Sequence, residues 1–170
     1  MIYFTVGDIT KSKTEAIINA ANGCGIMGAG ISGALKRVCG KIVEEEAKEA
    51  VKRNQKPFES GSCYYTGAGS LTGVSKIYHA VTMTYPGRQT TKDAVKNCFD
   101  KALIMAVVDG IKDISVPGLG IGIGRLNKNV CAEIMVEIAE KYKNLIDIYF
   151  VDLNDDFIDF CKKEAELNYE

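Results

Sequence analysis

Several features are scarce in this sequence: it has no tryptophan, three prolines and one histidine, and no apolar run approaches the length of a membrane span. A transmembrane helix needs about 20 consecutive apolar residues, so we expect no membrane partner. The N-terminus, MIYFTVGDIT, has no basic segment and soon reaches Gly7 and Asp8, unlike a secretory signal peptide. These absences predict a cytoplasmic protein.

The six cysteines lack the spacing of a metal or redox motif, because no two of them form a CxxC pair. Reduced and mostly buried thiols are the simplest interpretation, and they agree with a cytoplasmic location. We therefore predict no metal site. The cysteines are Cys24, Cys39, Cys63, Cys98, Cys131 and Cys161.

The sequence also has no large excess of charge of one sign, because its 21 basic residues nearly balance its 22 acidic residues and the formal net charge is -1. No surface-wide field would attract nucleic acid, although a local basic pocket is compatible with this balance. His79 offers the only imidazole for Ser-His-Asp chemistry. It lies in the strand-like run KIYHAVTM, which favours a structural histidine over a catalytic one.

Short apolar strands alternate with helical patterns along the 170 residues, which predict one domain over residues 1–170. The pattern indicates an α/β fold, a three-layer α/β/α sandwich with a central mixed β-sheet. Strands are expected at 2–6, 15–19, 62–66, 76–81, 114–116 and 146–151, with a loop over 20–30. Helices are expected at 31–37, 41–53 and 91–108, after a cap at Asn127, and near 155–165.

The segment PGLGIGIGR at 117–125 has glycine at every second position between a strand and a helix. Such glycines let a ligand lie against backbone N–H groups, and the following helix would add positive charge at its N-terminus. The ligand that this arrangement favours is a phosphate or diphosphate. The alternative is a tight strand-to-helix turn, which needs fewer glycines than the four present here.

A second small-residue loop runs over 19–35 and contains Asn19 and Asn22 beside its glycines. Asparagine side chains suit ribose hydroxyls, but they also satisfy loop backbone groups. We favour the backbone role for Asn19 and a ligand role for Asn22. Both loops follow strands, so both should line the crevice at the carboxyl ends of the sheet.

Residues 28–33 of the same loop formally match GxGxxG, which raises the hypothesis of a nicotinamide-dependent oxidoreductase. Against it, the first glycine lies far from the expected strand end, and no acidic residue ends a second strand about 20 positions later. No GxxxxGK[ST] motif occurs. Asp8, after the first strand, would accept a bond from an exocyclic amine or cap a turn, and its local sequence favours the cap.

Taken together, these segments resemble a macrodomain, the ADP-ribose-binding module, along nearly the whole chain. The resemblance implies the macrodomain fold and ADP-ribose as ligand or substrate, with no further cofactor. The segments are GDIT at 7–10, AIINAAN at 16–22, MGAGISGALKRVCG at 27–40, SCYYTGAGSL at 62–71, KIYHAVTMTYPG at 76–87 and SVPGLGIGIGRL at 115–126.

The resemblance also implies roles for individual residues. Asp8 should bind the adenine amine beside the Ile9 backbone, and Asn22 should hold the distal ribose. The loops at 28–32 and 120–124 should clamp the diphosphate and distal ribose, while Arg125 either contacts phosphate or points to solvent. The expected catalytic residues are Asn22 and Ser32. The expected ligand-binding residues are Asp8, Ile9, Ala21, Gly28, Ala29, Gly30, Ile31, Gly120, Ile121, Gly122, Ile123, Gly124, Arg125 and Leu126.

This sequence departs from hydrolytic relatives at the positions of their general bases. Ser32 stands where many carry an aspartate, and Gly124 stands where another branch carries one. The lysine of that second branch is missing from YHAVTM, and Leu126 replaces an aromatic residue that packs on the distal ribose.

Three functions follow from these patterns. The first is a metal-independent hydrolase that removes ADP-ribose from modified proteins or small esters, using a water positioned by the substrate phosphate, Asn22 and loop backbone. The second is a reader that binds ADP-ribose without catalysis, and the third is the oxidoreductase. The expected partners are ADP-ribose or an ADP-ribosylated protein, and nucleic acid only as an ADP-ribosylated substrate. Ser32 is expected to hydrogen-bond ligand or backbone, since no base for it is identified.

Overall fold

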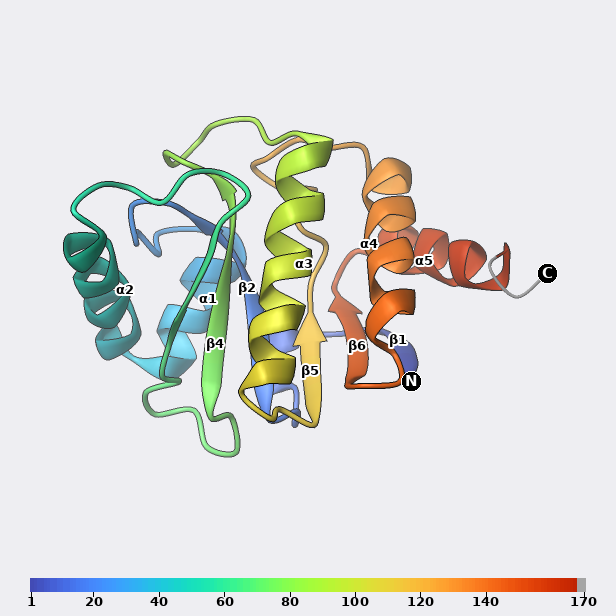
Figure 1. The fold of residues 1–170 in the computed structure, drawn as a ribbon, viewed down its shortest axis with the longest axis horizontal. Coiled ribbons are helices and arrows are strands. Elements are labelled where there is room, and N and C mark those ends of the chain that lie inside the picture. Colours follow the sequence, from blue (N-terminus) through green and yellow to red (C-terminus); the bar gives the residue numbers. More distant parts are fainter. Residues whose placement is uncertain (168–170) are drawn as a thin grey trace.

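The computed structural model describes residues 1–167, which form one six-stranded sheet flanked by five α-helices (Figure 1). The strands are β1 (Ile2–Val6), β2 (Ala16–Asn22), β3 (Cys63–Thr66), β4 (Lys76–Met83), β5 (Asp113–Val116) and β6 (Asp147–Asp152). The helices are α1 (Gly30–Cys39), α2 (Lys41–Asn54), α3 (Lys92–Val108), α4 (Lys128–Tyr142) and α5 (Asp155–Leu167), and a short 3-10 turn, η1, spans Ile9–Lys11.

The strand order across the sheet is β1-β6-β5-β2-β4-β3. The first five strands in this order are parallel, and β3 runs antiparallel to β4 at the edge. This mixed sheet confirms the predicted fold class. Because the five parallel strands share one direction, the segments that follow them all emerge at the same edge of the sheet.

Helices cover both faces of the sheet, with α3 and α4 in front of the strands and α1 behind them (Figure 1). The larger core is buried beneath α3, α4 and α5 and includes Phe99, Phe150 and Phe157. A second core, which includes Leu35 and Val43, holds α1 and α2 against the other face. Apolar residues at helical spacing therefore fix each helix by burial rather than by intrinsic propensity.

The end of β2 differs from the sequence expectation. Strand β2 does not end at Asn19 but continues through Ala20 and Ala21, which pair with β4, to Asn22. The small side chains do not signal a loop here, because hydrogen bonds to β4 keep this part of the backbone extended. The ladder is irregular between Ala21 and Asn22, so Asn22 is the first residue of β2 to leave regular register.

The thiols are as expected: every cysteine is free, and only Cys24 and Cys63 are not fully buried. Burial raises the pKa of Cys39 to about 11, which keeps this thiol protonated at neutral pH. Within residues 1–167, no helix has the length and apolar character needed to cross a membrane.

Candidate functional site

A cleft of about 620 Å³ opens at the edge where the parallel strands end. Each of the five parallel strands contributes residues to its walls, at or just after its last position. These residues are Gly7 and Asp8 after β1, Asn22 at the end of β2, Pro86 after β4, Gly118 after β5 and Asp152 at the end of β6. The cleft therefore lies where the parallel topology predicts a ligand site.

All but two of the residues predicted to form the site line this cleft. They are Asp8, Ile9, Ala21, Asn22, Gly28, Ala29, Gly30, Ile31, Ser32, Gly120, Ile121, Gly122, Ile123 and Gly124. Arg125 and Leu126 do not line it, but border a separate hollow with Asn127 and Lys128. Arg125 has a φ of 54° and an exposed side chain. The turn at the end of the loop therefore directs both residues away from the cleft.

One wall is the exposed backbone of Gly28, Ala29 and Gly30, which leads directly into α1. A Cβ atom added at Gly28 or Gly30 would meet no protein atom within 4 Å. At Gly28 nothing in the protein itself excludes a side chain, whereas the φ of +58° at Gly30 already favours glycine. The first N–H groups of a helix have no partner inside the helix and carry partial positive charge. This wall is suited to an anion.

Loop 117–126 forms the opposite wall. We expected its alternate glycines to let a ligand approach the backbone, but most of them are explained by contacts within the protein. A Cβ at Gly120 would lie 2.5 Å from Thr90 Cγ2, and one at Gly124 would lie 2.9 Å from the Gly120 carbonyl oxygen. At Gly118 it would lie 2.5 Å from Ile121 Cδ1. Only Gly122 is both exposed and open on its Cβ side. Internal packing thus accounts for three of the four glycines.

The helix that follows this loop does not direct its N-terminus into the cleft, contrary to the expectation. The Asn127 side chain caps α4 as predicted, accepting bonds from the N–H groups of Asn129 at 2.9 Å and Val130 at 3.2 Å. These residues border the separate hollow. Of the two helices that follow glycine-rich loops, α1 alone presents its first turn to the cleft.

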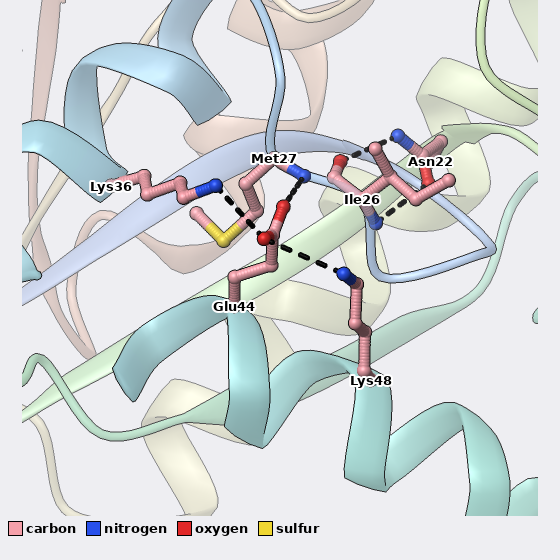
Figure 2. A network of polar contacts seen from close by, with 6 residues as sticks. All are labelled: Asn22, Ile26, Met27, Lys36, Glu44 and Lys48. Atoms are coloured by element: carbon pink, nitrogen blue, oxygen red, sulfur yellow. Dashed lines mark hydrogen bonds and ion pairs between the residues drawn. The ribbon is translucent and has the colours of Figure 1, made fainter. Parts of the chain in front are cut away.

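The side chain of Asn22 binds the neighbouring loop backbone (Figure 2). Its Nδ2 donates to the Ile26 carbonyl at 2.8 Å, and its Oδ1 accepts from the N–H groups of Cys24 at 3.0 Å and Ile26 at 3.3 Å. Asn22 therefore shapes the loop as well as lining the cleft, a role that the sequence reasoning had assigned to Asn19 alone.

A buried polar chain runs behind the cleft wall. The Asn19 Nδ2 lies 3.0 Å from Ser32 Oγ and 3.0 Å from His79 Nδ1, and His79 Nε2 lies 2.9 Å from Thr66 Oγ1. Thr66 donates to the Gly67 carbonyl at 2.8 Å, so His79 Nε2 carries the proton.

Burial lowers the pKa of His79 to about 3, and its side chain is fully buried. His79 is therefore structural, as predicted. Asn19 is also structural, but its side chain bonds the side chains of Ser32 and His79 rather than the loop backbone that was predicted. Ser32 lines the cleft with a hydroxyl held by Asn19.

Three charged side chains line the cleft, namely Asp8, Arg37 and Asp152. Asp8 Oδ1 accepts from the Thr10 hydroxyl at 2.7 Å and its N–H at 2.9 Å, which confirms the predicted cap and holds the Asp8 pKa below its usual value. Asp152 accepts from the N–H groups of Gly118 and Asn154, both at 2.8 Å. It thereby ties the second loop to the end of β6.

Sequence reasoning missed Arg37 and Asp152. Arg37 follows Ile31 and Ala34 at a spacing of three, and all three residues line the cleft from one face of α1. That spacing would have located Arg37. Asp152 had no comparable signal, because only the sheet order places the end of β6 beside β5. Among residues 1–167, no three His, Cys, Asp or Glu side chains gather in a way that could hold a metal ion.

Comparison with known proteins agrees with this architecture. The family model described as Macro domain matches residues 18–135. An uncharacterized protein of Aquifex aeolicus is 33% identical over 163 residues, covering 95% of each chain. A protein of Pantoea vagans named O-acetyl-ADP-ribose deacetylase 1 is 30% identical over 134 residues, covering 79% of this chain and 78% of its own.

Solved structures match the fold as well. A variant of the Oceanobacillus iheyensis macrodomain with ADPR has a TM-score of 0.88 at 23% identity, covering 99% of this chain and 92% of its own. The Trypanosoma brucei macrodomain in complex with ADP-ribose has a TM-score of 0.78 at 22% identity, covering 95% and 67%. With its mixed sheet, its cleft at the parallel strand ends and these matches, the chain belongs to the Macro domain family.

Proposed function

We propose that the protein binds ADP-ribose in the cleft and hydrolyses ADP-ribose from modified proteins or small ADP-ribose esters. The observation that carries this proposal is the open backbone at Gly28, Gly30 and Gly122, on two walls of one cleft. Diphosphate oxygens fit such backbone, because they need N–H donors at close approach and no intervening Cβ atoms. The family membership and the named deacetylases among the relatives support the same ligand.

The adenine end of the ligand is assigned to Asp8. Both hydrogen bonds that residues 1–167 make to this carboxylate go to Oδ1, which leaves Oδ2 for an exocyclic amine. The lowered pKa of Asp8 keeps it ionised at neutral pH, so it acts only as an acceptor. Arg37 supplies a cation on the same side of the cleft as α1, where a diphosphate would be neutralised.

Hydrolysis by this site would use a positioned water and no metal. In this proposal Asn22, Ser32 and the 28–32 backbone hold the ligand and the attacking water, and the substrate phosphate helps to orient that water. Positioning of this kind lowers a barrier by fixing the reacting atoms rather than by supplying a strong base.

A non-catalytic reader is the second candidate, and a specific observation favours it. The carboxylates that line the cleft, Asp8 and Asp152, already accept bonds from the protein, and His79 is buried and neutral. The cleft therefore offers no imidazole as a general base, and both of its carboxylates hold loop backbone in place.

Calorimetric titration with ADP-ribose, with AMP and NAD as controls, tests binding. Release of ADP-ribose from a modified protein and hydrolysis of O-acetyl-ADP-ribose, each measured against buffer, test catalysis. We expect ADP-ribose to bind more tightly than NAD and both reactions to exceed buffer. Binding of ADP-ribose without its release from substrates would establish the reader. Tighter binding of NAD than of ADP-ribose would refute ADP-ribose as the ligand and favour the oxidoreductase suggested by the GxGxxG match.

A further inference from the structure

The first glycine-rich loop is held from outside the cleft by a carboxylate of α2 (Figure 2). Glu44 Oε2 accepts a hydrogen bond from the backbone N–H of Met27 at 2.6 Å. Met27 directly precedes Gly28, where the open wall of the cleft begins. Glu44 does not line the cleft, so its influence on a ligand must pass through this backbone contact.

The second oxygen of Glu44 is occupied by two cations. Glu44 Oε1 lies 2.9 Å from Lys36 Nζ of α1 and 3.5 Å from Lys48 Nζ of α2, and the Glu44 side chain is 14% exposed. The hydrogen bond from Lys36, together with that from Met27 and the charge of Lys48, keeps the pKa of Glu44 below its usual value. One carboxylate thus joins α1, α2 and the loop by charge-assisted bonds, which are stronger than neutral ones.

Two further contacts hold residues 26 and 27 in place. Asn22 binds both the N–H and the carbonyl of Ile26, and the Met27 side chain is 2% exposed within the core beneath α1 and α2. The backbone of Ile26 and both the backbone and side chain of Met27 are therefore held by the protein, although the Ile26 side chain is exposed. In contrast, the cleft side of Gly28 and Gly30 is open, since a Cβ added at either would meet no protein atom within 4 Å. Gly30 already belongs to α1, so the path of the backbone between α1 and β2 is set by α1 on one side and by the anchor at Met27 on the other.

We propose that Glu44 is a positioning residue that sets the backbone of residues 28–30 for the diphosphate of the ligand. This role rests on the proposed function, because it presupposes an anion at that wall. The N–H groups of a loop bind an anion well only when their geometry exists before the ligand arrives. Without the bond to Met27, the loop must be ordered by the ligand itself, which lowers affinity.

The test separates the bond to Met27 from the ion pairs. In Glu44→Ala both are lost. In Lys36→Met the stronger ion pair is lost while the Met27 bond remains, and Glu44→Gln retains an acceptor for that bond without the charge. Glu45→Ala, on the exposed side of α2, is the matched control. Each variant is titrated with ADP-ribose and unfolded with urea.

We expect Glu44→Ala to weaken ADP-ribose binding about tenfold, and Glu44→Gln and Lys36→Met to stay within about threefold of wild type. Lys36→Met should lose stability without a matching loss of affinity, a split that a purely structural role would not produce. If Glu44→Ala does not fold, Glu44→Asp, which shortens the reach to Met27 but keeps the charge, replaces it with the same expected loss.

Two results would overturn the positioning role. One is an ADP-ribose affinity in Glu44→Ala equal to that of wild type. The other is a loss of affinity in proportion to the loss of stability in every variant. A wild-type protein that fails to bind ADP-ribose would instead refute the proposed function, so the two failures are distinct.

Discussion

The two glycine-rich loops line the same cleft, and each is tied to a distant carboxylate, but they differ in how far they bond to themselves. The first, over residues 23–30, is held from outside by Asn22 and Glu44 and leaves Gly28 and Gly30 open. The second, over residues 117–126, closes on itself through backbone bonds such as Leu126 N–H to the Gly120 carbonyl at 2.8 Å. In the first loop, Gly28 and Gly30 leave the cleft side open, whereas Gly23 and Gly25 lie against the backbone of Phe58 and Ala47. In the second loop only Gly122 is open.

Gly120→Ala should have the largest effect and should act on stability. Gly120 has a φ of +83°, and the added Cβ would meet Thr90 Cγ2 at 2.5 Å and Val95 Cγ2 at 3.3 Å. Left-handed strain and overpacking together should lower the free energy of unfolding by roughly 2–4 kcal/mol. Urea denaturation measures this. An unchanged midpoint would mean that the second loop is less tightly closed than its contacts indicate.

Gly28→Ala and Gly122→Ala should act on binding instead. Neither position has a positive φ, and neither Cβ would touch the protein, so stability should remain within about 0.5 kcal/mol. Loss of close approach by the diphosphate should weaken ADP-ribose binding about 10- to 100-fold.

Gly67→Ala is the matched control, because its φ is not positive and the added Cβ would make ordinary contact with Glu46 at 3.5 Å outside the cleft. Wild-type affinity in both cleft variants would contradict the open-backbone assignment.

Acidification should lower the free energy of unfolding through His79, which is buried behind the first loop beside Asn19. Because burial lowers the folded-state pKa of His79 to about 3, only the unfolded chain takes up this proton as the pH falls below about 6.5. Stability should therefore decline from pH 7 to 5.5 by about 1 kcal/mol.

His79 is the only histidine in the sequence, so no other histidine contributes to the change in the free energy of unfolding between pH 7 and 5.5. Urea denaturation at several pH values in this range measures that change. A flat profile would show that His79 can be protonated in the folded protein.

The smallest predicted effect is a difference in ADP-ribose affinity between variants of the two arginines beside the loops. Arg37 lines the cleft from α1, whereas Arg125 borders the separate hollow. Arg37→Ala should weaken ADP-ribose binding about fivefold, and Arg125→Ala less than about twofold. Titration of both variants at one salt concentration makes the comparison direct. The reverse order would mean that the second loop turns its end into the cleft when ligand binds.

Much of the fold was predictable from local patterns. The apolar stripes of α3 and α4 and the strands β1, β5 and β6 gave clear signals, because burial of one face imposes a period on the sequence. The end of β2 did not, since Ala20, Ala21 and Asn22 resemble a loop and become strand only through pairing with β4. Much of the cleft lining was likewise predictable, because glycine and asparagine cluster after strand ends.

The sequence by itself determined which segments follow strands, and hence that the two glycine-rich loops would line one cleft. Only the tertiary structure decided which glycines are open, that Arg125 and Leu126 turn away, and that Asp152 and Glu44 reach loops distant in sequence. The physical reason is that local patterns record the burial and conformation of each residue along its own segment. The free space beside a glycine, and the partner of a carboxylate, depend instead on segments that folding brings together.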